Sequence, residues 1–70
     1  MIIKRSITIK GHSTSISLEN SFWDGLNEIA KVRKTSIASL VAEIDKNRSS
    51  KQETGLSSAV RVFILNYFRG

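Results

Sequence analysis

Few side chains in this sequence could do chemistry, and their spacing does not assemble a catalytic or metal site. His12 is the only imidazole, and the chain has no cysteine. The acids Glu19, Asp24 and Glu28 have the spacing of solvated surface carboxylates, and no glycine-rich phosphate loop or metal-ligand motif accompanies them. We therefore expect a protein that is not an enzyme and that needs no cofactor and no metal.

The basic side chains are a more informative group. The chain has 11 Lys and Arg against 6 Asp and Glu, which gives a formal net charge of +5. Residues 1–12 and 31–51 are basic, whereas residues 13–30 carry three acids and no base. This layout suits a polyanion that is contacted by two separate surfaces, although a basic surface without a partner would look the same.

The length of 70 residues limits the chain to one domain, spanning residues 1–70. A chain this short buries only about 60% of its unfolded surface, so its core is marginal. Without cysteine it has no disulfide or thiolate metal site, and oligomerisation is the remaining means of support. The apolar runs are too short for a signal peptide or a membrane span, and we expect a cytoplasmic protein.

Two runs rich in β-branched residues alternate with period two and predict strands at about residues 4–10 and 13–18. Their apolar positions shift from odd numbers in the first run to even numbers in the second. Gly11-His12 at the junction suits a two-residue type II′ hairpin loop. A bulge in one long strand, or an N-terminal arm, would also absorb the shift.

That hairpin loop would fix which residues of the two strands face each other. It places Ile7 opposite Ile16 and Lys4 opposite Glu19, and both are favourable cross-strand pairs.

Three amphipathic runs predict helices at about residues 21–34, 36–48 and 57–68, with a polar segment over residues 46–55. Their expected N-caps are Ser21, Thr35-Ser36 and Ser57. The third run is apolar on most sides and needs cover on most sides. Because two short helices would not provide that cover within one chain, this run predicts a dimer.

Three sequence pieces occur in a defined order along the chain: GHSTSISLE, FWDGL and LSSAVRVFIL. In these pieces the chain resembles a bacterial group of short proteins in the ribbon-helix-helix superfamily, which includes the Arc and methionine repressors. The resemblance implies an α+β, mostly α fold: a homodimer with an intersubunit antiparallel β-ribbon, a possible N-terminal β-hairpin and an additional C-terminal helix. It also implies a DNA-binding transcriptional regulator with some degree of sequence specificity.

The resemblance also implies how DNA would be contacted. The ribbon would enter the major groove, and the start of the second helix would lie near the DNA backbone. The residues expected to face bases are Ser13, Ser15, Ser17, Lys10 and His12. Those expected to contact phosphate are Arg33, Lys34, Thr35, Ser36, Lys4 and Arg5. Arg33 and Lys34 would also end the first helix favourably, and the two roles are compatible.

The dimer interface is expected to comprise Ile16, Leu18, Trp23, Leu40, Val41, Ile44, Phe63 and Tyr67. Three features depart from the usual pattern. A serine-faced ribbon discriminates poorly between bases, Glu19 would repel phosphate unless paired, and a dimer with four adjacent strands would be too wide for the groove. The alternative function is a dimeric protein-interaction module, antitoxin-like or a scaffold, without independent DNA binding.

Overall fold

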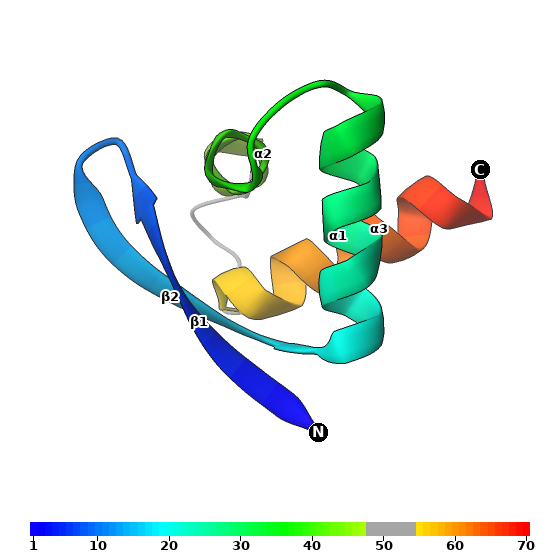
Figure 1. Cartoon of the computed structure of the whole chain (residues 1–70), viewed down its shortest axis with the longest axis horizontal. Coiled ribbons are helices and arrows are strands. Elements are labelled where there is room, and N and C mark those ends of the chain that lie inside the picture. The colour runs from blue at the N-terminus through cyan, green and yellow to red at the C-terminus, as the bar shows by residue number, and fades with distance from the viewer. Residues whose placement is uncertain (48–54) are drawn as a thin grey trace.

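An antiparallel hairpin followed by three helices makes up this computed structural model, which describes residues 1–47 and 55–70. The elements are β1 (Ile2–Ile9), β2 (His12–Glu19), α1 (Asn20–Val32), α2 (Ile37–Asn47) and α3 (Leu56–Arg69). Figure 1 shows the twisted hairpin along one side of the helices, with the C-terminus on the other side. The predicted α+β fold with an N-terminal hairpin and an additional C-terminal helix is confirmed. Most of the expected polar segment falls on residues 48–54, outside the described residues.

The hairpin turn differs from the one expected. Its two central residues are Lys10 and Gly11, and both have positive φ, 51° and 80°, as a type I′ turn requires. The Gly11-His12 loop with Ile7 opposite Ile16 is therefore wrong. A type I′ turn is favoured here because its twist matches that of the strands it joins.

The turn moves the cross-strand register by two residues. Ile7 faces Thr14, Ile16 faces Arg5, and Lys4 faces Ser17 rather than Glu19. In this register the odd residues of β1 share a face with the even residues of β2. That geometry explains why the apolar phase switches between the two runs of sequence.

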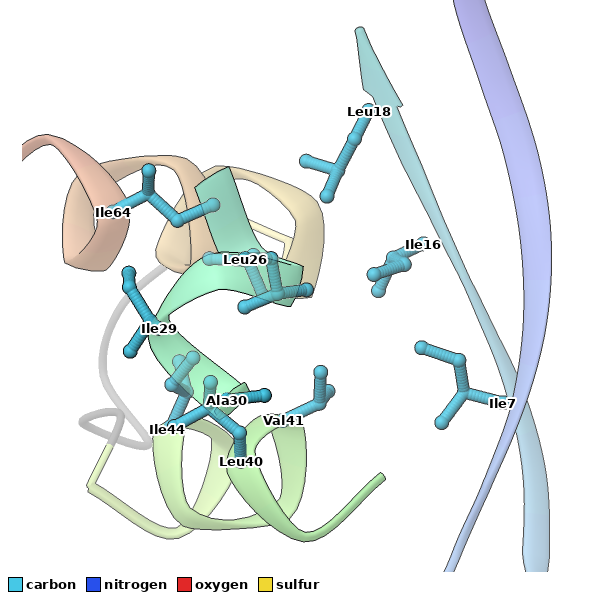
Figure 2. Packing of buried hydrophobic residues seen from close by; sticks show 11 residues of the cluster. Ile7, Ile16, Leu18, Leu26, Ile29, Ala30, Leu40, Val41, Ile44 and Ile64 are labelled. Carbon is cyan, nitrogen blue, oxygen red and sulfur yellow. The ribbon is translucent and has the colours of Figure 1, made fainter. Parts of the chain in front are cut away.

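One face of the hairpin packs on all three helices and forms a single core (Figure 2). Its buried members are Ile7, Ile16, Leu18, Leu26, Ile29, Ala30, Leu40, Val41, Ile44, Val60 and Ile64. Five of the residues expected at a dimer interface are therefore core residues of one chain: Ile16, Leu18, Leu40, Val41 and Ile44. Because one chain already buries these side chains, they have little surface to offer a second copy, and their place at a dimer interface stays a prediction.

The helix ends explain two further differences from the expected caps. β2 runs directly into α1, so Glu19 is the N-cap and Ser21 lies inside the helix. Gly55 is the N-cap of α3, and the Ser57 hydroxyl accepts a hydrogen bond from the strand instead. At the start of α2, the Ser36 hydroxyl accepts the Ser39 N–H at 3.0 Å, which is the contact expected of a cap.

Candidate nucleic-acid interface

The outer face of the hairpin, opposite the core, is polar and lined with hydroxyl groups. Two cross-strand pairs occupy its centre, Ser6 with Ser15 and Thr8 with Ser13, and all four side chains are exposed. Lys4 is exposed on the same face. Successive residues of a strand point to opposite faces. The alternation of Ser6 and Thr8 with apolar isoleucines was therefore the sequence pattern that could have placed them on this outer face. Those two residues were not among the expected base contacts.

Two residues expected to contact DNA belong to the other face of the hairpin. Arg5 lies over the Trp23 ring, with its guanidinium carbon 4.2 Å from the ring centroid. Its Nε is buried and finds no hydrogen-bond partner among the described residues. His12 pairs with Ile9 and lines a hollow of about 290 Å³ with Thr14. Arg5 and His12 therefore lie on the opposite side of the hairpin from Ser13 and Ser15, and their expected contacts with DNA stay predictions.

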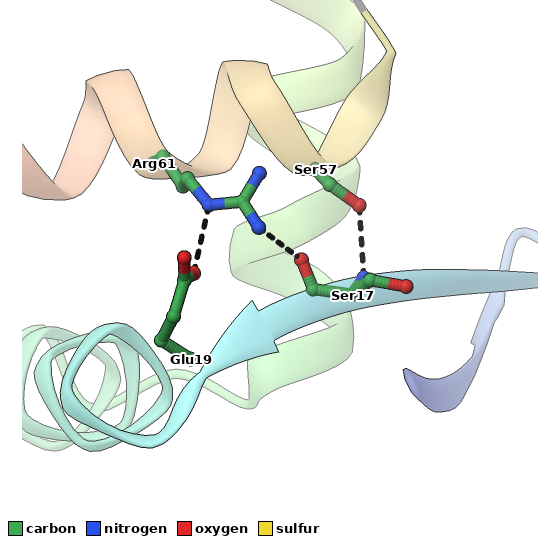
Figure 3. A network of polar contacts seen from close by, with 4 residues as sticks. All are labelled: Ser17, Glu19, Ser57 and Arg61. Carbon is green, nitrogen blue, oxygen red and sulfur yellow. Dashed lines mark hydrogen bonds and ion pairs between the residues drawn. The ribbon is translucent and has the colours of Figure 1, made fainter. Parts of the chain in front are cut away.

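A network of polar contacts joins α3 to the outer edge of β2 (Figure 3). The Ser17 N–H donates to the Ser57 hydroxyl at 2.8 Å, and Arg61 Nη2 donates to the Ser17 carbonyl at 2.8 Å. Arg61 Nε also donates to Glu19 Oε1 at 2.9 Å. Glu19, the acid that would have repelled phosphate, is thus paired with a cation. Ser17 is half-buried and less accessible than Ser13 and Ser15.

This network also limits how strands could pair between copies. In an antiparallel sheet the backbone groups of an edge residue are free to pair with another strand. At Ser17 both groups are already bonded to α3. A second copy could not pair with β2 along its whole length without displacing Ser57 and Arg61.

Acid should weaken this network through Glu19. Its pKa lies below the ordinary value of 4.5 because its own backbone N–H and then the Arg61 guanidinium bond the carboxylate. A lowered pKa in the folded state contributes stability above the unfolded pKa, and that contribution disappears as pH falls through the folded value. Urea unfolding from pH 7 to pH 3 should show wild type losing its advantage over Glu19→Gln below about pH 4.5. A difference that is constant across this range would contradict the assignment.

The turn between α1 and α2 presents a second group of cations. Arg33 and Lys34 are both exposed there. The Thr35 N–H donates to the Ala30 carbonyl at 2.9 Å and the Lys34 N–H to the Lys31 carbonyl at 3.2 Å, which is a Schellman motif. Lys34 occupies its left-handed position with φ 55°, where glycine is the usual residue. Lysine at this position carries a backbone strain that glycine would not.

Two substitutions of Lys34 distinguish the effect of its charge on DNA binding from the effect of its backbone conformation on stability. Lys34→Gly should stabilise the fold by about 0.5–1 kcal/mol, because relief of the left-handed strain exceeds the added flexibility of the unfolded chain. Lys34→Ala, which keeps the strain, should leave stability nearly unchanged. Both should weaken DNA binding by the same factor if the ammonium contacts phosphate. Thermal unfolding and fluorescence anisotropy measure the two effects, and equal DNA affinity in all three proteins would exclude the contact.

The other residues of this turn already make contacts within the chain. Arg33 Nη2 lies 3.4 Å from Glu43 Oε1, and the two side chains are 40% and 50% exposed, so the ion pair is weak. Thr35 is half-buried, and the Ser36 hydroxyl caps α2. In Figure 1 this turn and the hairpin tip lie apart, on different sides of α2. The structure thus has two separate groups of DNA-contact candidates.

Three of the expected interface residues keep some exposed surface. Trp23 is half-buried beneath Arg5, and Phe63 is half-buried against the core. Tyr67 is more exposed and makes an edge-to-face contact with Phe68, with ring centroids 5.2 Å apart.

Within the described residues, no group of three or more His, Cys, Asp or Glu is arranged to hold a metal ion. Over the same residues, no helix has the length and apolar character needed to cross a membrane. The features that remain are a polar hairpin face and a cationic turn.

These features define a small basic domain in which a two-stranded ribbon precedes helices. The family model described as ribbon-helix-helix domain matches residues 2–68, and the chain belongs to that family. Domains of this family are commonly DNA-binding transcriptional regulators or antitoxins and are typically non-enzymatic. No curated protein and no solved structure matches the chain significantly.

Proposed function

We propose that this protein is a homodimeric DNA-binding transcriptional regulator whose own hairpin serves as the ribbon. The observation that carries the proposal is the outer face of the hairpin. It presents Ser6, Thr8, Ser13 and Ser15 with Lys4, and its one acid, Glu19, is paired with Arg61. Such a face can approach a polyanion and hydrogen-bond to base edges.

The width of the ribbon supports this proposal. Two strands lie about 4.8 Å apart, and the major groove is roughly 12 Å wide and admits a two-stranded ribbon. Here both strands come from the same chain, so a ribbon needs no strand from a second copy. Lys10 at the turn would enter the groove or contact the flanking phosphates.

The turn between α1 and α2 would hold the DNA backbone at a second point. Arg33 and Lys34 supply charge there, and the backbone N–H groups in the first turn of α2 supply donors. The Ser36 hydroxyl is occupied by the Ser39 N–H, so its role is to fix the helix start.

Hydroxyl groups set the expected specificity. Serine and threonine hydroxyls can donate or accept and therefore bond to any base edge. We expect a modest preference among sequences, with most of the affinity coming from phosphate contacts. A regulator acting on DNA would be placed in the cytoplasm, as a single domain over residues 1–70.

Anisotropy titrations of a labelled mixed-sequence duplex at several salt concentrations test this function. About six phosphate contacts would give a log–log slope of affinity against salt near −5. No binding at low salt with tens of micromolar protein would exclude the proposal. That result would favour the alternative, a dimeric protein-interaction module.

A further inference from the structure

The two edges of the hairpin differ in what occupies their backbone groups. Next to a two-residue turn the facing residues exchange hydrogen bonds, and every second pair from there turns its N–H and C=O groups outward. Ser17 of β2 follows this rule, because both of its groups bond to α3. On β1 the outward groups are those of Lys4, which faces Ser17, and of Ser6 and Thr8.

The β1 edge is open in the part of the chain that the structure describes. Within residues 1–47 and 55–70, no hydrogen bond occupies the outward backbone groups of Lys4, Ser6 and Thr8. α1 and α3 pack against β2, and Figure 1 shows the N-terminal end of β1 on the far side of β2 from α3. α2 reaches β1 on its core face, where Ile7 is buried. Unpaired groups along an edge strand are a template for another extended chain.

The charges along β1 select the kind of chain that fits there. Residues 1–12 contain Lys4, Arg5 and Lys10 and no acid. Lys4 is exposed on the outer face, whereas Arg5 lies over Trp23 on the inner face, and its Nε is buried without an acceptor among the described residues. A buried donor without an acceptor is costly, and a carboxylate beside this guanidinium would supply one. Because adjacent strand residues point to opposite faces, two consecutive acids would reach Lys4 and Arg5 together.

We infer that the β1 edge binds an extended acidic segment of a partner protein as a third strand. The backbone of that segment bonds to the outward groups of Lys4, Ser6 and Thr8, and a pair of acids contacts Lys4 and Arg5. A second copy of the chain fits this edge less well, since its own β1 brings the same cations and no acid.

Occupation of the β1 edge would also act on DNA binding. The major groove is roughly 12 Å wide and admits two strands, whereas a third strand adds about 4.8 Å and covers Lys4. The partner segment and DNA should therefore compete for the hairpin. Only this competition rests on the proposed function, because strand addition itself does not require DNA binding.

Fluorescence anisotropy with a labelled, end-capped peptide of about eight residues tests the inference on the full chain. In this peptide, threonine and valine alternate around a central Glu-Glu pair. Wild type at about 100 µM should bind it, and a version with Lys-Lys at the centre should not bind. Ser6→Pro removes an outward N–H from the β1 edge and should raise the peptide Kd at least ~10-fold. Ser15→Pro is the matched control, because Ser15 faces Ser6 and turns its N–H to the β2 edge, and it should change the Kd less than ~2-fold.

Methylation of the peptide's backbone nitrogens keeps the test decisive if Ser6→Pro fails to fold by circular dichroism. Only alternate amides of an added strand face the edge, so methylating one alternate set should raise the Kd at least ~10-fold and methylating the other less than ~3-fold. No binding by wild type, equal binding of the Lys-Lys peptide, equal losses in folded Ser6→Pro and Ser15→Pro, or equal effects of the two methylated sets would each overturn the inference. A dimeric wild type with a monomeric folded Ser6→Pro on a sizing column would also overturn it, because a second copy would then occupy the edge.

Anisotropy of a labelled duplex on the same proteins reports DNA binding separately. Saturating peptide should weaken duplex binding at least ~10-fold, and an unchanged affinity would overturn the competition. Retained DNA binding without peptide binding would overturn this inference alone. Peptide binding without DNA binding would overturn the proposed function alone.

Discussion

A variant that carries both Lys4→Glu and Lys10→Glu should bind duplex DNA at least about 100-fold more weakly than wild type at 0.1 M salt. Each phosphate contact contributes about −0.9 to the log–log salt slope, so losing one contact lowers affinity roughly tenfold at that salt. Lys4 is exposed on the outer hairpin face, and Lys10 is exposed in the turn. Fluorescence anisotropy against salt would show both the weaker affinity and a slope that is shallower by about 2.

The matched control is a variant with Lys46→Glu and Arg69→Glu, which makes the same change in net charge. These two residues are exposed at the ends of α2 and α3, outside the proposed contacts. We expect its affinity to fall less than about fivefold, through the general loss of positive charge. Equal losses in the two double variants would show that DNA senses only net charge and that the hairpin is not the contact surface.

A second large effect is expected on stability when Arg61 is replaced by alanine. The hydrogen bond from this guanidinium to the Ser17 carbonyl is part-buried, and bonds to charged groups of this kind contribute about 1.5–3 kcal/mol. For a domain of this size the loss should lower Tm by roughly 6–24 °C. Calorimetry or thermal circular dichroism measures the change.

Arg33→Ala is the control for Arg61→Ala. The Arg33 side chain also pairs with a glutamate, but its 3.4 Å contact to Glu43 is exposed, and among the described residues it makes no hydrogen bond to a backbone group. Its replacement should change stability by less than about 0.5 kcal/mol. If both variants destabilise the fold equally, the contact between α3 and the strand edge does not have the structural role assigned to it.

The sequence pattern predicted the elements of the fold better than their connections. Period-two alternation identified both strands, and the switch of apolar phase between them follows directly from a hairpin. The register was wrong because it depends on which two residues form the turn. Lys10-Gly11 forms it with both residues at positive φ, and composition alone also allowed Gly11-His12.

The apolar third helix shows why burial was harder to predict than secondary structure. Its composition indicated that it needed cover, and a dimer was the expected source. In the structure, Val60 and Ile64 are covered within the same chain by elements far away in the sequence. Leu65 and Phe68 stay exposed, so the requirement for cover moves to a different face of the helix.

The candidate site was also only partly predictable from the sequence. Serines on alternate strand positions and cations before the second helix could be seen in the sequence. The contact between Glu19 and Arg61 could not, because 42 residues separate them and neither forms a local motif. The faces of Arg5 and His12 followed from alternation alone, because Arg5 shares a face with Ile7 and His12 with Ile16, and a register shift of two residues leaves these faces unchanged.

The most direct test of the account is a ¹H–¹⁵N NMR titration of the protein with a short duplex. The account predicts the largest amide shift changes in the hairpin, over residues 4–15, and a second group at residues 33–38. The amides of α3 around Leu65 should change little. Changes concentrated in α1 and α3, with an unaffected hairpin, would contradict the claim that the outer hairpin face is the DNA-binding surface.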